Sequence, residues 1–420
     1  MVIAQCQKCK REPSTVVSRK ETFCKSCFLK FVKGKQRKQM KDGRFKVKYG
    51  RNEDQTTEKT VSAILAFRFD GSSLVLLDIL ISWLEEQLAM SPRAHVGFNL
   101  TVLCYSLEQP QSWIAEKATQ IKTKYHGEEG ISRLHVKFEI LDCNDEVKRN
   151  EGLSGIYLTD HFESLIDRSN KVKGDALKMI DTQIQDKSAQ EDLKSVVERD
   201  VIVRHCLQLE CSILLLPDCM SELAISVLAF TARGRGERIS ETLGDNYIDV
   251  DGNRLEVLYP LRDILKSEIE SYLKICDLER FQAPKIDNTF KSVKNKTVNE
   301  LVREYFESVE PEYPEVISTV VKAGSKLRIP FSEGDVKRCG ICREIINDDP
   351  QNWLESITVN EGIPAKTEEE KRNYELYLSS IQRPEERELY TAGNKESISL
   401  CFGCVADLRN LRGKFSWPAD

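Results

Sequence analysis

The sequence predicts an α/β protein whose core is a doubly wound parallel sheet, with a cysteine-rich module near each end of the chain. Through the middle of the chain, short apolar segments of strand type alternate with longer segments of helical periodicity. This alternation is typical of parallel sheets covered by helices. In addition, eight of the 14 cysteines form four Cys-x-x-Cys pairs.

The expected strands and helices follow one another along the chain. Strands are expected at residues 61–67, 99–105, 136–141, 212–217 and 254–259. Helices are expected at residues 74–88, 112–124, 191–209, 220–232 and 261–276. Residues 144–190 are polar and weakly periodic, which indicates an insertion. Ligands of such sheets bind at the carboxyl ends of the strands, where strand order switches, so the loop at 67–73 is the first place to look for chemistry.

Length and composition favour two or three domains in a cytoplasmic protein. The chain has 420 residues and a mass of 48.1 kDa, which is large for a single core. Its best apolar run, Leu74 to Leu84, is interrupted by Asp78 and Ser82 and is shorter than the roughly 20 residues that span a bilayer. The first residues do not form a signal peptide, because no charged region precedes an apolar one. We therefore expect no membrane partner.

The Cys-x-x-Cys pairs predict two structural zinc sites. Two such turns supply four thiolates for a tetrahedral ion, with Zn–S near 2.3 Å. The ligands are Cys6, Cys9, Cys24 and Cys27 in the first site and Cys339, Cys342, Cys401 and Cys404 in the second. Four thiolates leave no open position, so both ions are expected to be structural. A disulfide framework is the alternative, and it is less compatible with a chain that has no secretion signal.

The first 51 residues are strongly basic, with 16 Lys/Arg and three Asp/Glu, although the whole chain has a net charge of −5. Phe28, Phe31 and Val32 recur at helical spacing and are expected to dock on the zinc module. The cations between and after them would then contact phosphates. The candidate nucleic-acid-binding residues are Lys33, Lys35, Arg37, Lys38 and Lys41, with Arg233 and Arg235 as a second choice. The alternative is a solvated basic tail that contacts no nucleic acid.

In this order of modules the chain resembles the cytosolic tRNA 2-thiolation proteins, and in particular their second subunit. Local matches occur in order along almost the whole length. They are residues 19–24, 233–236 (Arg-Gly-Arg-Gly), 259–263 (Tyr-Pro-Leu-Arg-Asp) with Glu268, Ile269 and Tyr272, 313–321 running on to 325–327, and 400–404. The resemblance implies four regions: a zinc module with a basic arm at 1–50, a PP-loop-type (adenine nucleotide alpha hydrolase-like) domain at 57–283, a helical connector at 284–335 and a second zinc module at 336–420.

The nucleotide loop of that family is degenerate here. Catalytic members carry Ser-Gly-Gly-x-Asp-Ser after the first strand, and their glycines and backbone N–H groups cradle ATP phosphate. The corresponding residues are Arg68, Phe69, Asp70, Gly71, Ser72 and Ser73. The Cβ atoms of Phe69 and Asp70 would block close approach of phosphate, and Asp70 adds a repulsive charge of about 4 kcal/mol at ~4 Å and an effective dielectric of ~20. We expect this loop to bind no ATP productively.

Two further departures point the same way. Catalytic members carry core cysteines linked to an iron–sulfur cluster or to sulfur relay, and the spacing of Cys206 and Cys211 does not match them. We therefore expect no iron–sulfur cluster. The acidic motif that those members carry after the fourth strand becomes Pro217-Asp-Cys-Met-Ser-Glu.

The resemblance implies the non-catalytic half of a heterodimer. With a catalytic PP-loop subunit, the chain would 2-thiolate the wobble uridine of tRNAs for lysine, glutamate and glutamine, using sulfur from a thiocarboxylated ubiquitin-related modifier. Two alternatives stay open. In the first, Cys206, Cys211 or Cys219 carries persulfide and the chain is itself a sulfurtransferase. In the second, the chain is a zinc adapter in ubiquitin-like conjugation with no RNA role.

Overall fold

The chain forms two compact units, Met1–Cys143 with Glu198–Ile329, and Asn144–Val197 with Pro330–Asp420. The computed structural model describes residues 5–49, 60–125, 127–148, 156–158, 180–182, 184–243, 247–250, 253–284, 296–327, 338–339, 341–346, 367–380, 390–392 and 400–408. Most of the insertion expected at 144–190 lies outside these ranges. The first unit contains the main sheet, and each unit contains one group of four cysteines.

The main sheet has six strands in the order β10-β11-β9-β4-β6-β7. Five are parallel: β4 (Val61–Phe67), β6 (Phe98–Cys104), β7 (Val136–Ile140), β9 (Ile213–Leu215) and β11 (Asn253–Leu258). The sixth, β10 (Tyr247–Val250), was not predicted and runs antiparallel to β11. Because β6 lies on one side of β4 and β9 on the other, the strand order switches beside β4, and the predicted doubly wound sheet is confirmed.

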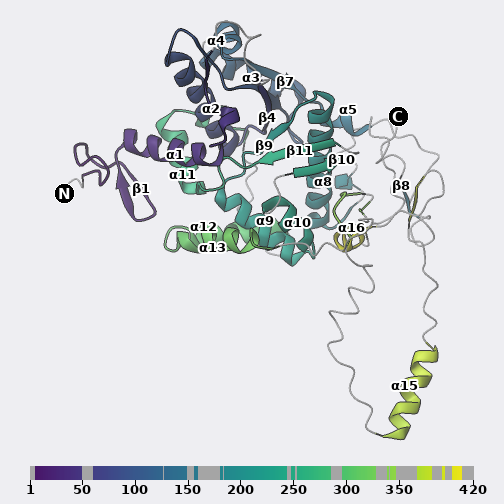
Figure 1. Ribbon diagram of the computed structural model, residues 1–420. Coiled ribbons are helices and arrows are strands. Elements are labelled where there is room, and N and C mark those ends of the chain that lie inside the picture. Colours follow the sequence, from purple (N-terminus) through teal and green to yellow (C-terminus); the bar gives the residue numbers. More distant parts are fainter. Residues whose placement is uncertain are drawn as a thin grey trace. The chain divides into compact units, whose positions relative to one another are not determined.

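Helices connect these strands (Figure 1). They are α2 (Gly71–Ala89), α3 (Gln111–Lys124), α4 (Gly127–Arg133), α8 (Lys187–Gln208), α9 (Met220–Ala232), α10 (Gly236–Leu243) and α11 (Lys266–Ile275). The helix expected at 261–276 begins at Lys266 instead, because the Glu268 side chain accepts a hydrogen bond from the Leu265 N–H and caps the helix there. The eight-residue α10 was not predicted.

The polar interruptions of the apolar run in α2 are contact points. Asp78 accepts hydrogen bonds from the hydroxyls of Tyr125 (2.8 Å) and Tyr272 (2.9 Å). Ser82 accepts one from the Lys33 ammonium at 2.6 Å. Because Tyr272 lies in α11 and Lys33 in the N-terminal helix, α2 is the element on which both of these helices are fixed.

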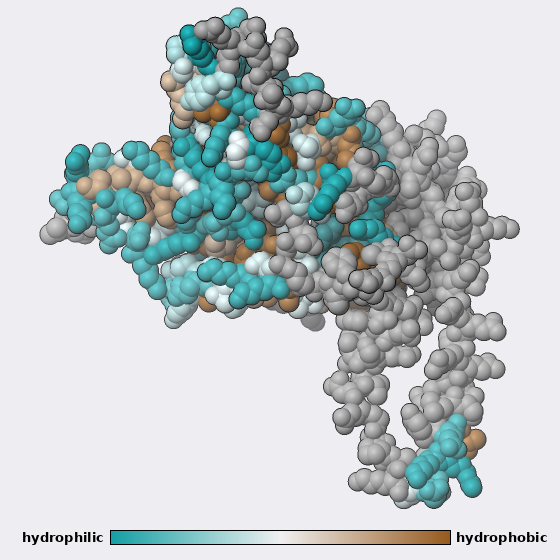
Figure 2. Space-filling model, viewed as in Figure 1, coloured by the Kyte–Doolittle hydropathy of each residue, from teal (hydrophilic) through white to brown (hydrophobic). Residues whose placement is uncertain are grey.

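Two further helices, α12 (Val298–Val309) and α13 (Pro314–Gly324), lie side by side and pack on α9 (Figure 1). They fall within the helical connector expected at 284–335. Phe306, Ile317 and Val321 are buried in the apolar cluster that they form with α9 and α10. Hydrophilic residues cover most of the visible surface over these two helices (Figure 2).

The remaining described elements are small. In the first unit they are β1 (Val16–Ser18), β2 (Glu21–Phe23), α1 (Lys25–Gln39), η1 (Gly43–Phe45), β3 (Lys48–Tyr49), β5 (Ala94–His95) and η4 (Glu279–Phe281). The second unit contains β8 (Ile156–Leu158), α15 (Glu368–Ser380), β12 (Tyr390–Ala392) and α16 (Phe402–Leu408), while α5 (Cys143–Lys148) begins where the two units meet in the chain. None of the helices in the described ranges is both long and apolar enough to cross a membrane.

Candidate metal centres, basic helix and first-strand loop

The four N-terminal cysteines converge as predicted. The sulfur atoms of Cys6, Cys9, Cys24 and Cys27 all lie within 4.8 Å of one another, and those of Cys9 and Cys24 are 3.9 Å apart. Sulfurs placed tetrahedrally around one ion at 2.3 Å lie about 3.8 Å apart. The arrangement therefore fits a single tetrahedral metal ion.

Local hydrogen bonds shape each half of this site. In the first half, the Lys10 N–H donates to the Cys6 carbonyl at 2.8 Å, and Lys10 has a φ of +54°. The hairpin of β1 and β2 then leads to Cys24, which is the N-cap of α1. In the second half, the Phe28 N–H donates to the Cys24 carbonyl at 3.0 Å. The second pair of ligands is thus built into the start of α1.

The C-terminal cysteines converge in the same way, although 58 residues separate the two pairs. All four sulfurs, of Cys339, Cys342, Cys401 and Cys404, lie within 4.8 Å of one another, and those of Cys342 and Cys401 are 3.5 Å apart. The Arg343 N–H donates to the Cys339 carbonyl at 2.9 Å. Both predicted ligand sets are therefore brought together, and the described residues contain no third group of this kind.

The helix α1 docks on the first module through aromatic side chains, as predicted. The ring of Phe31 stacks on that of Phe23 with centroids 5.1 Å apart, and Phe28 meets Phe23 edge-on at 6.3 Å. Phe28 and Val32 are fully buried. The module and the helix are therefore one packed body.

Several cations of α1 point toward the α/β core. Lys33 bonds Ser82 of α2, and Arg37 forms an ion pair with Glu86 of the same helix. Lys35 points toward a buried carboxylate of α11. Lys38 and Lys41, by contrast, are exposed. The predicted phosphate contacts are therefore divided between cations that pair with the core and cations that are exposed.

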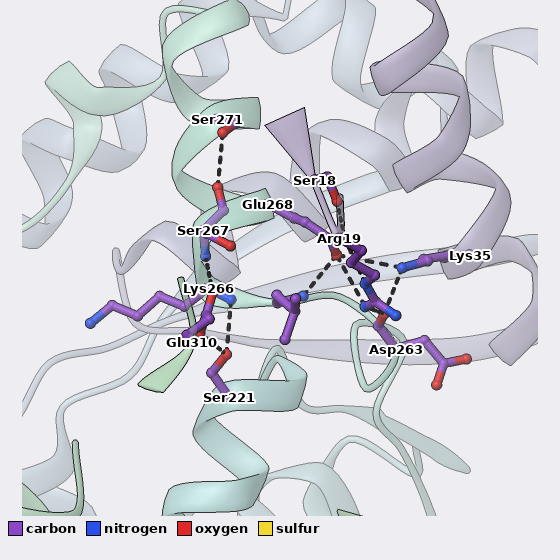
Figure 3. Close-up of polar contacts among 11 residues, drawn as sticks. Ser18, Arg19, Lys35, Ser221, Asp263, Lys266, Ser267, Glu268, Ser271 and Glu310 are labelled. Carbon is purple, nitrogen blue, oxygen red and sulfur yellow. Dashed lines mark hydrogen bonds and ion pairs between the residues drawn. The ribbon is translucent and has the colours of Figure 1, made fainter. Parts of the chain in front are cut away.

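Glu268 of α11 is the centre of a buried network that ties the metal module to the core (Figure 3). Its carboxylate is 1% exposed and accepts hydrogen bonds from the Ser18 hydroxyl at 2.5 Å and from Arg19 Nε at 3.0 Å. Lys35 Nζ lies 3.5 Å from the same carboxylate. Arg19 and Lys35 also donate to the carbonyl of Asp263. Two segments that carry the family resemblance, 19–24 and 259–268, thus meet in space.

Lys35 does not belong to an accessible phosphate-binding face. Its side chain is 16% exposed. Burial, opposed by the charge of Glu268, lowers the pKa of Lys35 to about 8. A phosphate would have to displace the Glu268 carboxylate to reach this ammonium, so the placement of Lys35 does not support the predicted role.

The Arg-Gly-Arg-Gly segment is the C-terminal cap of α9. Gly234 has a φ of +68°, and the Arg235 N–H donates to the Phe230 carbonyl at 2.8 Å, which is a Schellman arrangement. Arg235 is 1% exposed, and Arg233 is half-buried against Asn299. Arg235 therefore has no access to a nucleic acid in this conformation, and we leave it out of the proposed surface.

The loop after β4 is occupied by its own side chains. The Ser73 N–H at the start of α2 donates to Asp70 Oδ1 at 2.7 Å, so a protein carboxylate caps this helix end. Arg68 pairs with Asp70 (3.1 Å) and with Asp218 (2.9 Å), and the Ser72 hydroxyl donates to Glu222 at 2.9 Å. Asp218 and Glu222 belong to the other degenerate segment, 217–222.

Aromatic and aliphatic groups close the rest of the loop. Phe69 is fully buried between Phe67 and Trp113, with ring centroids at 4.8 and 5.2 Å. Its φ of +60° is a conformation that favours glycine, which the resembling enzymes carry here. A Cβ on Gly71 would come within 2.8 Å of Leu273 Cδ1. The loop therefore keeps a backbone conformation that favours glycine, but side chains of this chain fill the space beside it.

Carboxylates dominate the electrostatics around this loop. Burial, followed by the charges of Asp70 and Asp218, raises the pKa of Glu222 to about 7. Burial also raises the pKa of Glu198, which accepts a hydrogen bond from the Tyr105 hydroxyl at 2.8 Å. An additional polyanion would be repelled here.

The three cysteines of the persulfide alternative are all buried. Cys206 and Cys219 are 0% exposed and Cys211 is 8% exposed. Burial raises the pKa of each thiol. A persulfide carrier needs a reactive thiolate, so their surroundings favour a structural role.

Comparison with known proteins agrees with this layout over the full chain. The family model described as cytoplasmic tRNA 2-thiolation protein 2 matches residues 297–406. The protein of that name from Debaryomyces hansenii is 32% identical over 419 residues, covering 98% of this chain and 91% of that protein. The one from Vanderwaltozyma polyspora is 35% identical, covering 99% and 94%. The chain belongs to the cytoplasmic tRNA 2-thiolation protein 2 family. That name agrees with the cytoplasmic location expected from the sequence.

A solved structure shares the fold of this family member. The U34-tRNA thiolase NcsA from Methanococcus maripaludis, determined with its 4Fe-4S cluster, superposes with a TM-score of 0.52 at 15% identity. The match covers 86% of this chain and 99% of the thiolase. At this identity the likeness establishes the fold only.

Sequence reasoning missed the Glu268 network and the exposed glycine at position 34. A local signal for Glu268 was present, since Glu three residues after a helix N-cap is the acidic half of a capping box. No local signal indicates that Arg19 and Lys35 share this carboxylate.

Proposed function

We propose that this chain is the non-catalytic subunit of a heterodimer that 2-thiolates the wobble uridine of tRNAs for lysine, glutamate and glutamine, as in 5-methoxycarbonylmethyl-2-thiouridine. The partner is a catalytic PP-loop subunit, and sulfur comes from a thiocarboxylated ubiquitin-related modifier. Family membership supports a role in tRNA 2-thiolation. This chain contributes structure and tRNA contacts rather than a reacting group.

The observation that carries the non-catalytic assignment is the filled loop at the switch point. An anion-binding helix start needs free N–H groups and open space. Here the Ser73 N–H is taken by Asp70, and Leu273 faces Gly71. Productive ATP binding would have to break the Arg68–Asp218 pair and place phosphates among carboxylates.

Both cysteine groups are proposed to hold one structural zinc ion each. Four thiolates with no further ligand are a usual structural zinc set. The close approach of the sulfurs, all within 4.8 Å, suits one ion better than a four-iron cluster, which occupies more space between its ligands. Bound zinc would supply no chemistry beyond holding the two halves of each module together.

The tRNA surface is proposed to lie on the outward side of the N-terminal module and α1. Lys30, Lys38 and Lys41 are exposed there, while Lys33 and Arg37 reach the edge of the same surface through contacts with α2. The Arg37–Glu86 pair is solvent-exposed, and such pairs contribute little, so Arg37 can exchange Glu86 for a phosphate.

Nucleotide binding by the full chain tests the non-catalytic assignment. Because the loop is filled, saturating ATP with Mg²⁺ should leave the melting temperature unchanged within error. A ligand present at 100 times its dissociation constant would stabilise the chain by about 2.7 kcal/mol. A clear upward shift that disappears in Ser73→Ala would show that the loop binds nucleotide and would contradict the assignment.

Salt-dependent tRNA binding tests the surface. Replacing Lys30, Lys38 and Lys41 by Ala should weaken binding and flatten its salt dependence by about 2 units of slope, at 0.7–0.9 per phosphate. Cognate and non-cognate tRNAs should be affected alike, because phosphate contacts carry no sequence information. The control variant replaces Lys322 and Lys326, which are equally exposed on and after α13. Equal slopes for the triple variant and wild type would show that α1 does not contact RNA.

A further inference from the structure

The outward face of α1 has a gap in its row of side chains at Gly34. The helix contains six cations and no carboxylate: Lys25, Lys30, Lys33, Lys35, Arg37 and Lys38. Lys30, Gly34 and Lys38 are all exposed and recur every four residues. At about 100° per residue they span about 80° of the helix circumference, so they form one stripe.

Packing does not account for glycine at position 34. A Cβ built there meets nothing within 4 Å, and the residue does not have a positive φ. The helix continues on both sides of it from Lys25 to Gln39. Glycine inside a helix is destabilising relative to alanine, so the chain tolerates a less stable helix at the centre of its exposed cationic stripe.

Cations on both flanks of this stripe are held by contacts with the core. Lys33 and Arg37 contact α2, and Lys35 is partly buried beside Glu268. The stripe therefore has a fixed position, with about 12 Å between the Cα atoms of Lys30 and Lys38 at 1.5 Å per residue. Lys30 and Lys38 thus lie about one turn before and one turn after a position that has no Cβ.

We infer that Gly34 is the point at which the sugar–phosphate backbone of a bound RNA lies directly against α1, with Lys30 and Lys38 on either side of one phosphate group. Without a Cβ, the RNA backbone can approach the helix closely, and both ammonium groups reach the same charge. The contact reads no base, so it does not depend on sequence. The inference rests on the proposed tRNA-binding function and assigns it to one residue.

The test is substitution of Gly34 in the full chain, with an unmodified tRNA transcript as the probe in anisotropy titrations. Gln is a good helix former that fills the gap. Gly34→Gln should weaken binding about 5–10-fold while the melting temperature stays equal or rises by about 1–3 °C. Gly34→Ala should also weaken binding without lowering the melting temperature, but the loss of affinity should be smaller, about 2–3-fold. Gly236→Gln is the matched control, because Gly236 is also exposed with nothing within 4 Å, and it should leave affinity unchanged.

A lysine at position 34 distinguishes the effect of filling the space at Gly34 from the effect of adding a positive charge. Gly34→Lys adds a cation to the stripe but fills the gap, so the inference predicts binding no tighter than wild type. Tighter binding by Gly34→Lys, or wild-type affinity in well-folded Gly34→Gln, would overturn it. Wild-type chain that binds no tRNA at low salt would instead contradict the proposed function itself, and the inference with it.

Discussion

The two four-cysteine sites have the same local construction but different surroundings. In each, the residue after the first Cys-x-x-Cys has a positive φ, +54° at Lys10 and +62° at Arg343, and donates its N–H to the first cysteine's carbonyl. In each, the second pair begins a helix, α1 or α16. The N-terminal site, however, continues into a helix that packs on α2 and α11 and is tied to Glu268. The same Cys-x-x-Cys turn, here called the knuckle, therefore occurs at both sites. The N-terminal site is distinguished by the contacts of α1 with α2 and α11.

Ligand removal should have the largest effect and should separate the two sites. Cys24→Ser removes a ligand at the residue from which α1 begins, whereas Cys401→Ser removes a ligand in the second unit. Structural zinc contributes about 10–16 kcal/mol in zinc-finger peptides, so each variant should lose one zinc and unfold its own module. Only Cys24→Ser should reduce tRNA affinity, by at least about 10-fold. If elemental analysis of the wild-type chain gave fewer than two zinc ions, the claim that both sites bind zinc would be refuted.

Disrupting the Glu268 network should have an intermediate effect on the free energy of unfolding, and this effect should be confined to the N-terminal site. Glu268→Gln removes the buried negative charge that Arg19 and Lys35 share. Breaking a buried ion pair costs about 3–5 kcal/mol, and the retained amide oxygen should bring the loss toward the lower figure. Denaturant unfolding measures it. The control Glu86→Gln, at the exposed pair with Arg37, should cost less than about 1 kcal/mol. Equal losses for the two variants would mean that the network does not hold the module.

Relief of backbone strain should have the smallest effect and should be alike at the two sites. Lys10→Gly and Arg343→Gly place glycine at a positive φ, which should stabilise each knuckle by about 0.5–1 kcal/mol. Resistance of each site to a chelator reports this change. Lys8→Gly is the control, since Lys8 does not have a positive φ. A gain at one site only would show that the two knuckles are not equivalent.

The fold could be predicted because its strands and helices are long and strongly patterned. The apolar run at 61–67 and the helix at 220–232 were located to the residue. The four-residue β10 was missed because it contains an aspartate and lies among polar residues and glycines, whereas the three-residue β9 lies in a continuous apolar run. The start of α11 was misplaced because Leu261 to Leu265 fit the apolar pattern while Glu268 sets the cap.

The candidate site was less accessible to sequence reasoning, since its contacts join distant residues. Periodicity grouped the cations of α1 but did not reveal that Lys35 faces a carboxylate more than 200 residues away. The degenerate segments at 68–73 and 217–222 were each recognised as departures. Only the structure brings Arg68 to Asp218 and Ser72 to Glu222, so that each segment fills the space beside the other.

The rate of 2-thiouridine formation by the heterodimer tests the central claim most directly, with Ser73→Ala in this chain as the variant. Ser73 is the only residue of the loop that matches the catalytic motif, and it is fully buried with its hydroxyl accepting from the Arg68 N–H at 3.2 Å. Because the loop is filled by protein, the rate should stay near that of the wild-type complex, whereas the equivalent change in the partner should abolish it. A well-folded Ser73→Ala complex that loses about 100-fold or more in rate, the scale of a positioned catalytic group, would show that this chain performs chemistry.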